Sequence, residues 1–474
     1  MDGPYATGAT SITLSSTANL QVGSMLILDQ LDDPTTDNGA IWVCQTINIC
    51  SQQTGAANGR PNRAQQQLVR VTAINGTSVL ITPGLYMPNW RSSQSPAAWW
   101  SNDTPISMSG IENLSIDHSG SGTTIKSGIY FYNAYNCWVK NVRSLNSNRN
   151  HVWLYQSAHV SVRNSYFYGT ANAASESYGT EQFMAADNLV ENNIFQHITA
   201  PMLNAGGTGS VFGYNYAIDD YYGVSPTWQQ SSSYHHAAGN SFFLWEGNDG
   251  PGLTADDIHG SSHFITAFRN VWPGWEPGKT QETIPIHLEA WNRYYNFVGN
   301  VLGKIAYHTR YEAAAASPTD AGNASFGDRS IYTVGYSGNE GTNLSPIPND
   351  TLVKLTMMRW GNYDTVHAAT QWNASEVPTT LSQFSNAVPG NQALPNSLYL
   401  SSKPSWWAAT PWPAIGPDVS GGQDPTGHAY KIPAHACYDN TSKTGGILNF
   451  NAVTCYPDTA APGAPTHLRI VVGS

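Results

Sequence analysis

Charged residues are scarce in this chain of 474 residues, of which only 11% are Asp, Glu, Lys or Arg. Lys and Arg number 21 against 32 Asp and Glu, which gives a formal net charge of −11 at pH 7. Nucleic acids and anionic membrane surfaces attract basic proteins, so this balance argues against both as partners. A hydrophobic content of 40% also excludes a disordered chain, because disorder accompanies low hydrophobicity and high net charge.

Long hydrophobic runs are missing as well. No stretch of about 18 apolar residues occurs, so the sequence predicts no insertion into a membrane. The segment from Met1 to Tyr5 lacks a basic stretch followed by an apolar one. We therefore expect that any secretion signal has been removed or was never present.

Cysteine is rare, with five in the whole chain. Cys44 and Cys50 lie six residues apart in a polar loop, and Cys437 and Cys455 flank a Gly-Gly stretch, so we predict two local disulfides. Disulfides persist in oxidising compartments, and the sequence therefore predicts a secreted protein, extracellular or periplasmic. Cys137 lies in an apolar segment and is expected to be a buried free thiol. No Cys-x2-Cys or close Cys/His group indicates a structural metal site.

Glycine, asparagine, serine and threonine are abundant, which is typical of short strands and many tight turns. From Gly110 onward an asparagine recurs within short apolar segments at intervals of about 22 to 30 residues, which is roughly one turn of a three-sided β-coil. One coil cannot bury its own apolar face, whereas stacked coils bury a continuous core. An asparagine at each bend tolerates left-handed backbone geometry and can bond to its counterpart in the next coil. The recurring residues are Asn113, Asn141, Asn164, Asn193, Asn215, Asn240, Asn270 and Asn300.

The segment from Gly110 to Ile116, with the sequence GIENLSI, resembles the entry strand of the pectate-lyase-like right-handed parallel β-helix superfamily. The segments 397–400, 403–407 and 412–418 resemble the tail that follows the coils in bacterial members of that superfamily. The resemblance covers roughly residues 110–420. It implies an all-β fold, a right-handed parallel β-helix, and activity on carbohydrate polymers.

Three parts are expected along the chain. Residues 1–108 are predicted to form an N-terminal cap with an inserted β-hairpin subdomain, because the alternating segments 68–74 and 79–81 are joined by Asn75-Gly76. Residues 109–400 are expected to form the parallel β-helix. Residues 401–474 are expected to form an irregular tail that packs on the helix.

A column of polar residues recurs after pairs of large residues, and its last two members are Glu246 and Glu289. Equivalent residues in adjacent coils lie about 4.8 Å apart, close to the separation of roughly 5–5.5 Å between the two carboxyl groups of a retaining glycosidase. We predict that Glu246 and Glu289 are the acid/base and the nucleophile, in an order that the sequence leaves open. A slip of one residue would send either side chain into the core, so the prediction depends on register.

The segment 247–260 is longer than the repeat needs, and such excursions commonly carry function. It contains Asp249, Asp256, Asp257 and His259. We predict that Asp249, Asp257 and His259 position substrate or water. The acidic side chains also make calcium a possible cofactor, although hydrolysis requires none.

Aromatic residues are plentiful, with 16 Trp and 25 Tyr, and aromatic planes suit the apolar faces of sugar rings. Histidines such as His235, His236 and His263 are candidate proton carriers, because His titrates near neutral pH. The residues predicted to bind substrate are Trp245, Trp291, His287, Arg293, Asn204, Arg359 and Trp360.

Three functions are compatible with this pattern. The leading hypothesis is a glycoside hydrolase that cleaves a polysaccharide with a pair of carboxylates. The second is a polysaccharide lyase, in which calcium offsets the charge of a uronate polymer and Arg293 or a His removes the proton. The third is a non-catalytic glycan-binding or structural surface β-helix, because one scaffold can carry unrelated functions.

Overall fold

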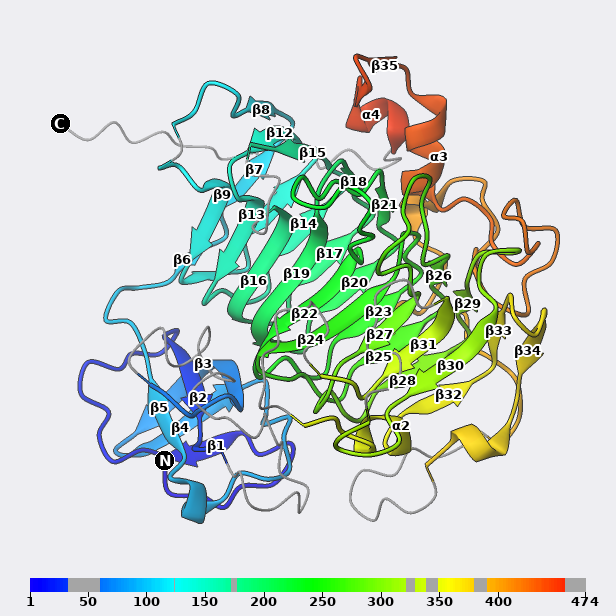
Figure 1. The fold of residues 1–474 in the computed structure, drawn as a ribbon. Helices are drawn as coiled ribbons and strands as arrows, with labels where there is room; N and C mark the ends of the chain where they lie inside the picture. Colours follow the sequence, from blue (N-terminus) through cyan, green and yellow to red (C-terminus); the bar gives the residue numbers. More distant parts are fainter. Residues whose placement is uncertain are drawn as a thin grey trace.

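A computed structural model describes residues 1–32, 60–122, 124–171, 177–320, 329–337, 348–378 and 390–456. Three parallel sheets wind the chain into a right-handed parallel β-helix, which runs diagonally across Figure 1. Each coil contributes one strand to each sheet, and the strands pair in parallel with their counterparts in the next coil. The predicted fold class is confirmed.

Sheet 1 has nine short strands, and the middle residue of each points into the coil. In register, this inner column reads Ile111, Val139, Val162, Val190, Phe212, Trp245, Ala267, Phe297 and Arg359. Burial of each large apolar side chain contributes about 1.5–3 kcal/mol, which is why this alternation fixes the register. The strands are β7 (Gly110–Glu112), β11 (Trp138–Lys140), β14 (Ser161–Arg163), β17 (Leu189–Glu191), β20 (Val211–Gly213), β23 (Leu244–Glu246), β25 (Thr266–Phe268), β28 (Asn296–Val298) and β32 (Met358–Trp360).

Sheet 2 follows sheet 1 across a sharp corner and is interrupted once. Asp249 bridges its two parts, because it pairs with Tyr216 on one side and with Val271 on the other. The strands of the first part are β8 (Ser115–Asp117), β12 (Arg143–Ser147), β15 (Tyr166–Thr170), β18 (Ile194–Gln196) and β21 (Tyr216–Ile218). Those of the second are β26 (Val271–Trp272), β29 (Val301–Leu302), β33 (Asn362–Asp364) and β34 (Ala369–Gln371).

Sheet 3 completes each coil and has the longest strands. Its strands are β9 (Ser127–Tyr132), β13 (Asn150–Tyr155), β16 (Tyr178–Ala186), β19 (Ala200–Thr208), β22 (Ser233–Ala237), β24 (Leu253–His259), β27 (Ile286–Leu288), β31 (Ser330–Val334) and β30 (Arg310–Ala314). The short strands β6 (Ile106–Ser107) and β10 (Ala134–Tyr135) pair beside its first coils.

Two series of asparagines turn the corner between sheets 1 and 2. The first takes left-handed backbone angles, with φ of 56° at Asn113 and 55° at Asn192. The second points inward, and in it each side-chain amide donates to the side-chain oxygen of the next coil over about 3.0 Å. This buried ladder consists of Asn193, Asn215, Asn248, Asn270, Asn300 and Asn362.

The interpretation of Asn240 as one of these landmarks is wrong. The member of the ladder in that coil is Asn248, whose side chain bonds to Asn215 and Asn270. Asn240 lies at the corner after sheet 3, where its oxygen accepts the Gly206 N–H over 3.0 Å.

The N-terminal region forms a small antiparallel sheet against the outer side of sheet 3. Ile27 and Leu68 from this region share a buried apolar cluster with Leu203 of β19. The predicted hairpin is confirmed, although its two-residue turn is Gly76-Thr77, since Asn75 pairs with Ser78. Its strands are β1 (Ser11–Thr13), β2 (Met25–Asp29), β3 (Gln66–Asn75), β4 (Ser78–Thr82) and β5 (Ala97–Trp99), and the short helix η2 (Ser92–Gln94) lies between β4 and β5.

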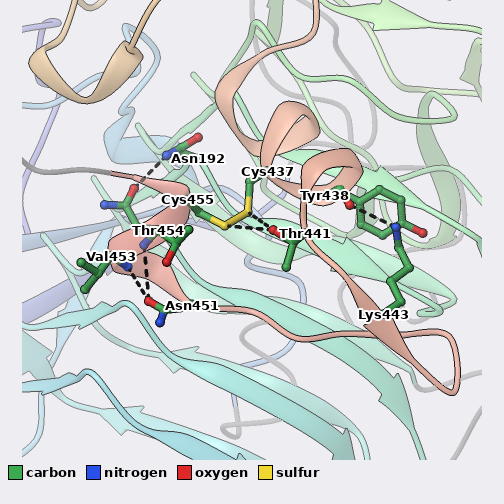
Figure 2. Close-up of a disulfide and its surroundings, with 10 residues drawn as sticks. Asn192, Cys437, Tyr438, Thr441, Lys443, Asn451, Val453, Thr454 and Cys455 are labelled. Carbon is green, nitrogen blue, oxygen red and sulfur yellow. Dashed lines mark hydrogen bonds between the residues drawn. A yellow bond between two sulfur atoms is a disulfide. The ribbon is translucent and has the colours of Figure 1, made fainter.

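The C-terminal region lies against sheets 1 and 2. Cys437 of α3 (Pro433–Asn440) and Cys455 of α4 (Ala452–Cys455) form the predicted disulfide, with Thr441 beside both sulfurs (Figure 2). Cys137 is a buried free thiol, as predicted, whereas the predicted Cys44–Cys50 disulfide lies outside the described residues. The remaining elements are α2 (Leu352–Leu355), η3 (Ala374–Glu376), η4 (Ser405–Trp407), β35 (Lys443–Thr444) and β36 (Ile447–Leu448).

In the part of the chain described, no helix has the length and apolar character needed to cross a membrane.

Candidate active site

A bulge at the end of β24 gathers the ionisable side chains of the candidate site. His235 of β22 pairs with Ala255, and Ala237 pairs with His259, so residues 256–258 stand opposite the single residue His236. Bulges of this kind re-aim side chains and are frequent beside active sites. Here the bulge places Asp256 and Asp257 beside two histidines.

His236 and Asp256 form a close pair at this bulge. The His236 Nδ1 atom lies 2.5 Å from the Asp256 Oδ2 atom, and a carboxylate only accepts, so Nδ1 carries the hydrogen. The basic nitrogen of the neutral ring is then Nε2. The Asp256 carboxylate is fully buried, whereas the His236 side chain is 19% exposed. The buried carboxylate thus orients an imidazole that reaches the surface.

His259 lies against His236, with ring centroids 4.8 Å apart and nearly perpendicular planes. Burial, reinforced by the neighbouring His236, lowers the pKa of His259 to about 4. His259 is therefore neutral around pH 7 and can donate or accept a hydrogen bond without carrying charge.

Asp257 and Glu289 form a buried carboxyl pair next to these histidines. The Asp257 backbone N–H donates to the Glu289 Oε2 atom over 2.8 Å, and both residues have an exposed fraction of 0%. Burial raises the pKa of Asp257 to about 7, and the charge of Asp256 raises it further, against the opposing effects of Glu289 and His287. Asp257 is thus a carboxyl group that holds its proton into the neutral range, as a general acid does.

His287 completes the cluster on β27. Its Nδ1 atom contacts the Glu282 Oε1 atom in a short hydrogen bond, and both side chains are buried. The positive charge of a protonated His287 would favour the ionised form of Asp257. Protonation of His287 therefore couples to the proton on Asp257.

Asn292 holds the backbone of the bulge in place. Its side-chain amide donates to the carbonyls of Ala255 and Asp256 over 3.0 and 3.1 Å, and its oxygen accepts the Ser262 N–H over 2.8 Å. A rigid supporting shell of this kind keeps reactive groups within a few tenths of an ångström of their working geometry.

A row of aromatic side chains lies on the same outer face of sheet 3, over its first two coils. Tyr130 and Tyr132 of β9 are 50% and 42% exposed, and Trp153 and Tyr155 of β13 stand beside them in register. Neighbouring rings lie 5.0 to 6.3 Å apart. Three strand spacings of about 4.8 Å separate Tyr155 from His236, which is roughly 14 Å along the axis.

The prediction that Glu246 and Glu289 occupy neighbouring rungs is wrong. Glu246 ends β23 of sheet 1, where it pairs with Gly213 and Phe268, whereas Glu289 follows β27 of sheet 3. The Glu246 carboxylate is buried beneath the C-terminal region, where it accepts bonds from the Tyr214 hydroxyl (2.7 Å) and the Leu398 N–H (2.8 Å). Glu246 therefore fixes the tail on the coil.

Asp249 also lies away from the cluster. It belongs to sheet 2, and its Oδ2 atom lies 2.6 Å from the Nδ1 atom of His435 in α3. The segment predicted as one loop is divided between two sheets, because Asp249 bridges sheet 2 and β24 belongs to sheet 3. Of the five residues predicted to be catalytic, the structure brings together Asp257, His259 and Glu289.

Two residues predicted to bind substrate point into the coil. Trp245 is fully buried, stacks on Phe212, and donates its indole N–H to the Nε2 atom of His235 over 3.0 Å. Asn204 has an exposed fraction of 0% and donates to the Tyr234 carbonyl. The substrate-binding prediction for both residues is wrong, because the inner column of each strand faces the core.

The other predicted binding residues lie in different places. Arg359 ends the inner column of sheet 1 and pairs with Glu312 and Glu376, and Trp360 packs on Trp372. Neither belongs to the cluster, so their prediction as parts of one site is wrong.

Trp291 and Arg293 lie just after Glu289 at the corner of sheet 3. The Arg293 guanidinium lies over the Trp291 ring and bonds to Asp350 over 2.7 Å, and this arrangement buries its charge within the fold. His287 is the one predicted binding residue that the structure places among the clustered carboxyl groups.

The sequence does not predict that His236 and Asp256 form a pair at the centre of this cluster. Both were among many candidate groups, but the spacing of 20 residues between them says nothing about contact until the strands are in register. Glu181, also on the outer side of sheet 3, was missed altogether. It binds Arg149 and Asn150 over 2.9 and 2.5 Å, and its presence in a strand otherwise free of charge was the available signal.

Within the ranges that the structure describes, no group of three or more His, Cys, Asp or Glu side chains has the arrangement of a metal site.

No protein-family model matches the sequence, and no curated protein matches it. Three solved structures are similar in fold, and the chain covers less than two thirds of each. The tailspike protein gp49 from Pseudomonas phage LKA1 has 13% identity and a TM-score of 0.43, with 65% of this chain and 47% of that chain covered. The Gp54 tailspike of Acinetobacter baumannii bacteriophage AP22, solved in complex with A. baumannii capsular saccharide, has 10% identity and a TM-score of 0.45, with coverages of 65% and 45%. The Pseudomonas phage phi297 tailspike gp61 has 10% identity and a TM-score of 0.42, with coverages of 72% and 64%.

Proposed function

We propose that this protein is a glycoside hydrolase that cleaves a polysaccharide, with its active centre at the bulge of β24. The observation that supports this most directly is Asp257, a buried carboxyl group with a pKa of about 7 beside Glu289 and the His236–Asp256 pair. Glycoside hydrolysis needs a group that donates a proton to the leaving oxygen and a second that activates water. Two titratable groups whose surroundings push their pKa values apart can take these two roles, one as the acid and the other as the base.

In the proposed reaction, Asp257, which the free protein keeps buried, comes into contact with the glycosidic oxygen as the glycan binds, and it donates its proton to that oxygen as the bond from the oxygen to the anomeric carbon breaks. The His236 Nε2 atom accepts a proton from the water whose oxygen forms the new bond to that carbon. Asp256 stabilises the imidazolium that results, because its carboxylate is buried against Nδ1. Glu289 holds the Asp257 backbone and keeps the carboxyl group in place.

The exposed aromatic row gives the proposed enzyme a surface for the rest of the glycan chain. Tyr130, Tyr132, Trp153 and Tyr155 present ring faces and edges on the same side of sheet 3 as the cluster. Sugar rings bury their apolar C–H faces well against aromatic planes.

Elimination is the second candidate reaction, because a His–Asp pair can also remove a proton from carbon. In that case His236 would take the proton adjacent to a uronate carboxylate, and Asp257 would protonate the leaving oxygen. The cluster described here contains no Lys or Arg, so neutralisation of the uronate has no evident source among its members. This difference favours hydrolysis.

Membership of the pectate-lyase-like superfamily and a secreted location belong to the same proposal. The Cys437–Cys455 disulfide supports an oxidising compartment, because such bonds are rare in reducing ones. The net charge of −11 is compatible with an extracellular enzyme whose partner is a neutral or weakly acidic glycan.

The test is a screen of neutral and acidic polysaccharides with the full chain, followed by the variants Asp257→Asn and His236→Gln. Loss of a general acid or base lowers the rate by about 10²–10⁴-fold, so each variant should fall by that amount on the glycan that is cleaved. The activity should also decline as pH rises above about 7, where Asp257 loses its proton.

His197→Gln is the matched control, since His197 and Asp219 form a similar pair at 2.9 Å on another part of the surface. This variant should keep full activity. New reducing ends without ultraviolet absorbance indicate hydrolysis. If the product shows the ultraviolet absorbance of an unsaturated uronate, the reaction is elimination and not hydrolysis. Cleavage that survives in both active-centre variants would place the active site elsewhere, and binding without cleavage of any glycan would favour a non-catalytic surface protein.

A further inference from the structure

A cavity lies on a different side of the molecule from the β24 bulge. It has a volume of about 380 Å³ and opens between sheet 2 and the C-terminal region. Val271 of β26 and Val301 of β29 form its floor, and residues 423–426 and 429–431 form the opposite wall. Small-molecule sites typically have volumes of about 300–1,000 Å³, so the cavity is large enough for one.

The cavity combines an apolar surface with one cation that is not used elsewhere. Trp275 lines it, and the indole N–H of Trp275 donates to the Lys279 carbonyl over 3.0 Å, which fixes the ring. The Lys304 ammonium lies 5.2 Å from the centre of that ring. Among the described residues Lys304 has no carboxylate partner, whereas Lys431, the other lysine of the lining, pairs with Asp439 over 2.6 Å.

Two carboxylates reach the cavity, and both are already bound within the protein. Asp424 accepts the backbone N–H groups of Thr426 and Ala429 over 2.9 and 2.7 Å. Asp249 bonds to His435, whose ring stacks on Tyr216 with centroids 4.0 Å apart. Both carboxylates are thus committed to partners of their own, and Lys304 is the cation of the lining for which the described residues supply no carboxylate.

From this arrangement we infer that the cavity binds the acidic sugar residue of a glycan, in which a pyranose ring carries a carboxylate. The apolar face of the ring would pack against Trp275 and the two valines, and the carboxylate would pair with Lys304. This site goes beyond the proposed hydrolase, because it requires no cleavage and lies on sheet 2 rather than sheet 3.

Saturation-transfer NMR of the full chain with D-glucuronate, D-glucose and acetate tests this inference. Glucuronate should bind saturably. Glucose and acetate should each bind at least tenfold more weakly, because glucose lacks the carboxylate and acetate lacks the sugar ring. Lys304→Met should weaken glucuronate binding at least tenfold, and Lys304→Arg should restore most of it. Lys403→Met is the matched control, since Lys403 lies outside the cavity and only donates to the Thr410 carbonyl.

Thermal unfolding of each variant confirms that it folds, and Trp275→Leu provides a second test of the aromatic contact. Glucuronate that fails to bind saturably, or binds Lys304→Met as tightly as the unchanged protein, overturns the inference. If acetate binds as tightly as glucuronate, the inference that the cavity recognises a sugar ring is overturned. Asp257→Asn should leave the binding unchanged, so failure of the proposed hydrolase and failure of this site give separate results.

Discussion

At the scale of single residues, the β24 bulge brings together two groups whose pKa values are shifted in opposite directions. Asp257 has a pKa of about 7 because burial disfavours its charged form, and His259 has a pKa of about 4 for the same reason. Both groups are therefore neutral at a pH slightly below 7. Asp256, between them in the cluster, is paired with His236. The site thus holds a proton donor on β24 and an oriented base on the neighbouring strand β22.

Asp257 should make stability depend on pH. Its folded pKa lies above its unfolded value near 4, so the folded state binds the proton more tightly. The resulting contribution is fully present below about pH 4 and is lost as the pH rises through about 7. Asp257→Asn removes this titration, so the variant should gain stability relative to the unchanged protein between pH 4 and pH 8.

Thermal unfolding at these two pH values measures that effect. Asp32→Asn is a useful comparison, because burial also raises the pKa of Asp32 to about 7 in the N-terminal region. It should show the same direction of change without an effect on glycan cleavage. An Asp257→Asn variant whose melting temperature shifts equally at both pH values would contradict the assignment of a raised pKa.

Glu246 illustrates a carboxylate with a structural role. It accepts bonds from the Tyr214 hydroxyl and the Leu398 N–H, and burial raises its pKa. Glu246→Gln replaces one acceptor oxygen by a donor, which leaves a buried donor facing another donor. We expect a loss of about 1–3 kcal/mol in the free energy of unfolding. Denaturant titration measures the loss, and faster proteolysis near residue 398 should accompany it; unchanged values for both would argue against this anchoring role.

At the scale of elements, the buried asparagine ladder joins successive coils. The Asn270 oxygen accepts both the backbone N–H and the side-chain amide of Asn248, over 2.9 and 3.0 Å. Its own amide donates to the Trp245 carbonyl and to Asn300. Asn270→Ala removes these partners at once and leaves buried polar groups unsatisfied, so we expect a loss of about 2–5 kcal/mol.

Asn296→Ala provides the control for the ladder. Asn296 lies on the neighbouring strand β28, and its amide makes a single 3.3 Å bond to the Thr266 hydroxyl. Its removal should cost about 1 kcal/mol or less. Chemical denaturation compares the two variants, and equal losses would show that the ladder contributes no more than an ordinary side-chain hydrogen bond.

The spacing of asparagines was enough to predict the coils, because one turn of the solenoid places one asparagine at the same corner. It was not enough to place each strand. Leu244-Trp245-Glu246 and His287-Leu288-Glu289 look alike as sequences, yet the first forms β23 of sheet 1, just before the ladder residue Asn248, and the second lies at the end of β27 in sheet 3. An alignment on the shared pattern of large and polar residues therefore places Glu246 on the wrong side of the coil.

The bulge of β24 could not be predicted for a different reason. In a regular strand each residue pairs with one residue of the next strand. At the bulge, residues 256–258 of β24 lie opposite the single residue His236 of β22. The acidic residues and the histidine were recognised as candidates because charged residues are so few. Their contacts depend on which strands are neighbours across 20 to 50 residues of sequence, and local patterns do not contain that information.

At the scale of the whole molecule, the N-terminal and C-terminal regions cover different faces of the three-sided coil. The N-terminal sheet packs on sheet 3 near the β24 bulge, and the C-terminal region closes over sheets 1 and 2 (Figure 1). Arg269 connects this tail to the coil, since its buried guanidinium binds Asp418 over 2.6 and 2.8 Å and the Pro395 and Ile415 carbonyls. The tail is thus held along its length rather than only at its disulfide.

Removal of the disulfide should therefore loosen the end of the tail and leave the coil intact. Cys437 and Cys455 are 18 residues apart, and a crosslink over a loop of that length stabilises a protein by about 3 kcal/mol. In the variant with both cysteines changed to serine, amide exchange should rise in α3 and α4, while the strands of sheet 3 keep their protection. His435 of α3 lines the sheet 2 cavity, so glucuronate binding should weaken in the same variant, whereas glycan cleavage at the β24 bulge should persist. Equal loss of protection in α3 and in sheet 3 would show instead that tail and coil unfold as one unit, because the contacts of Arg269 and Glu246 would then couple them more strongly than the crosslink does.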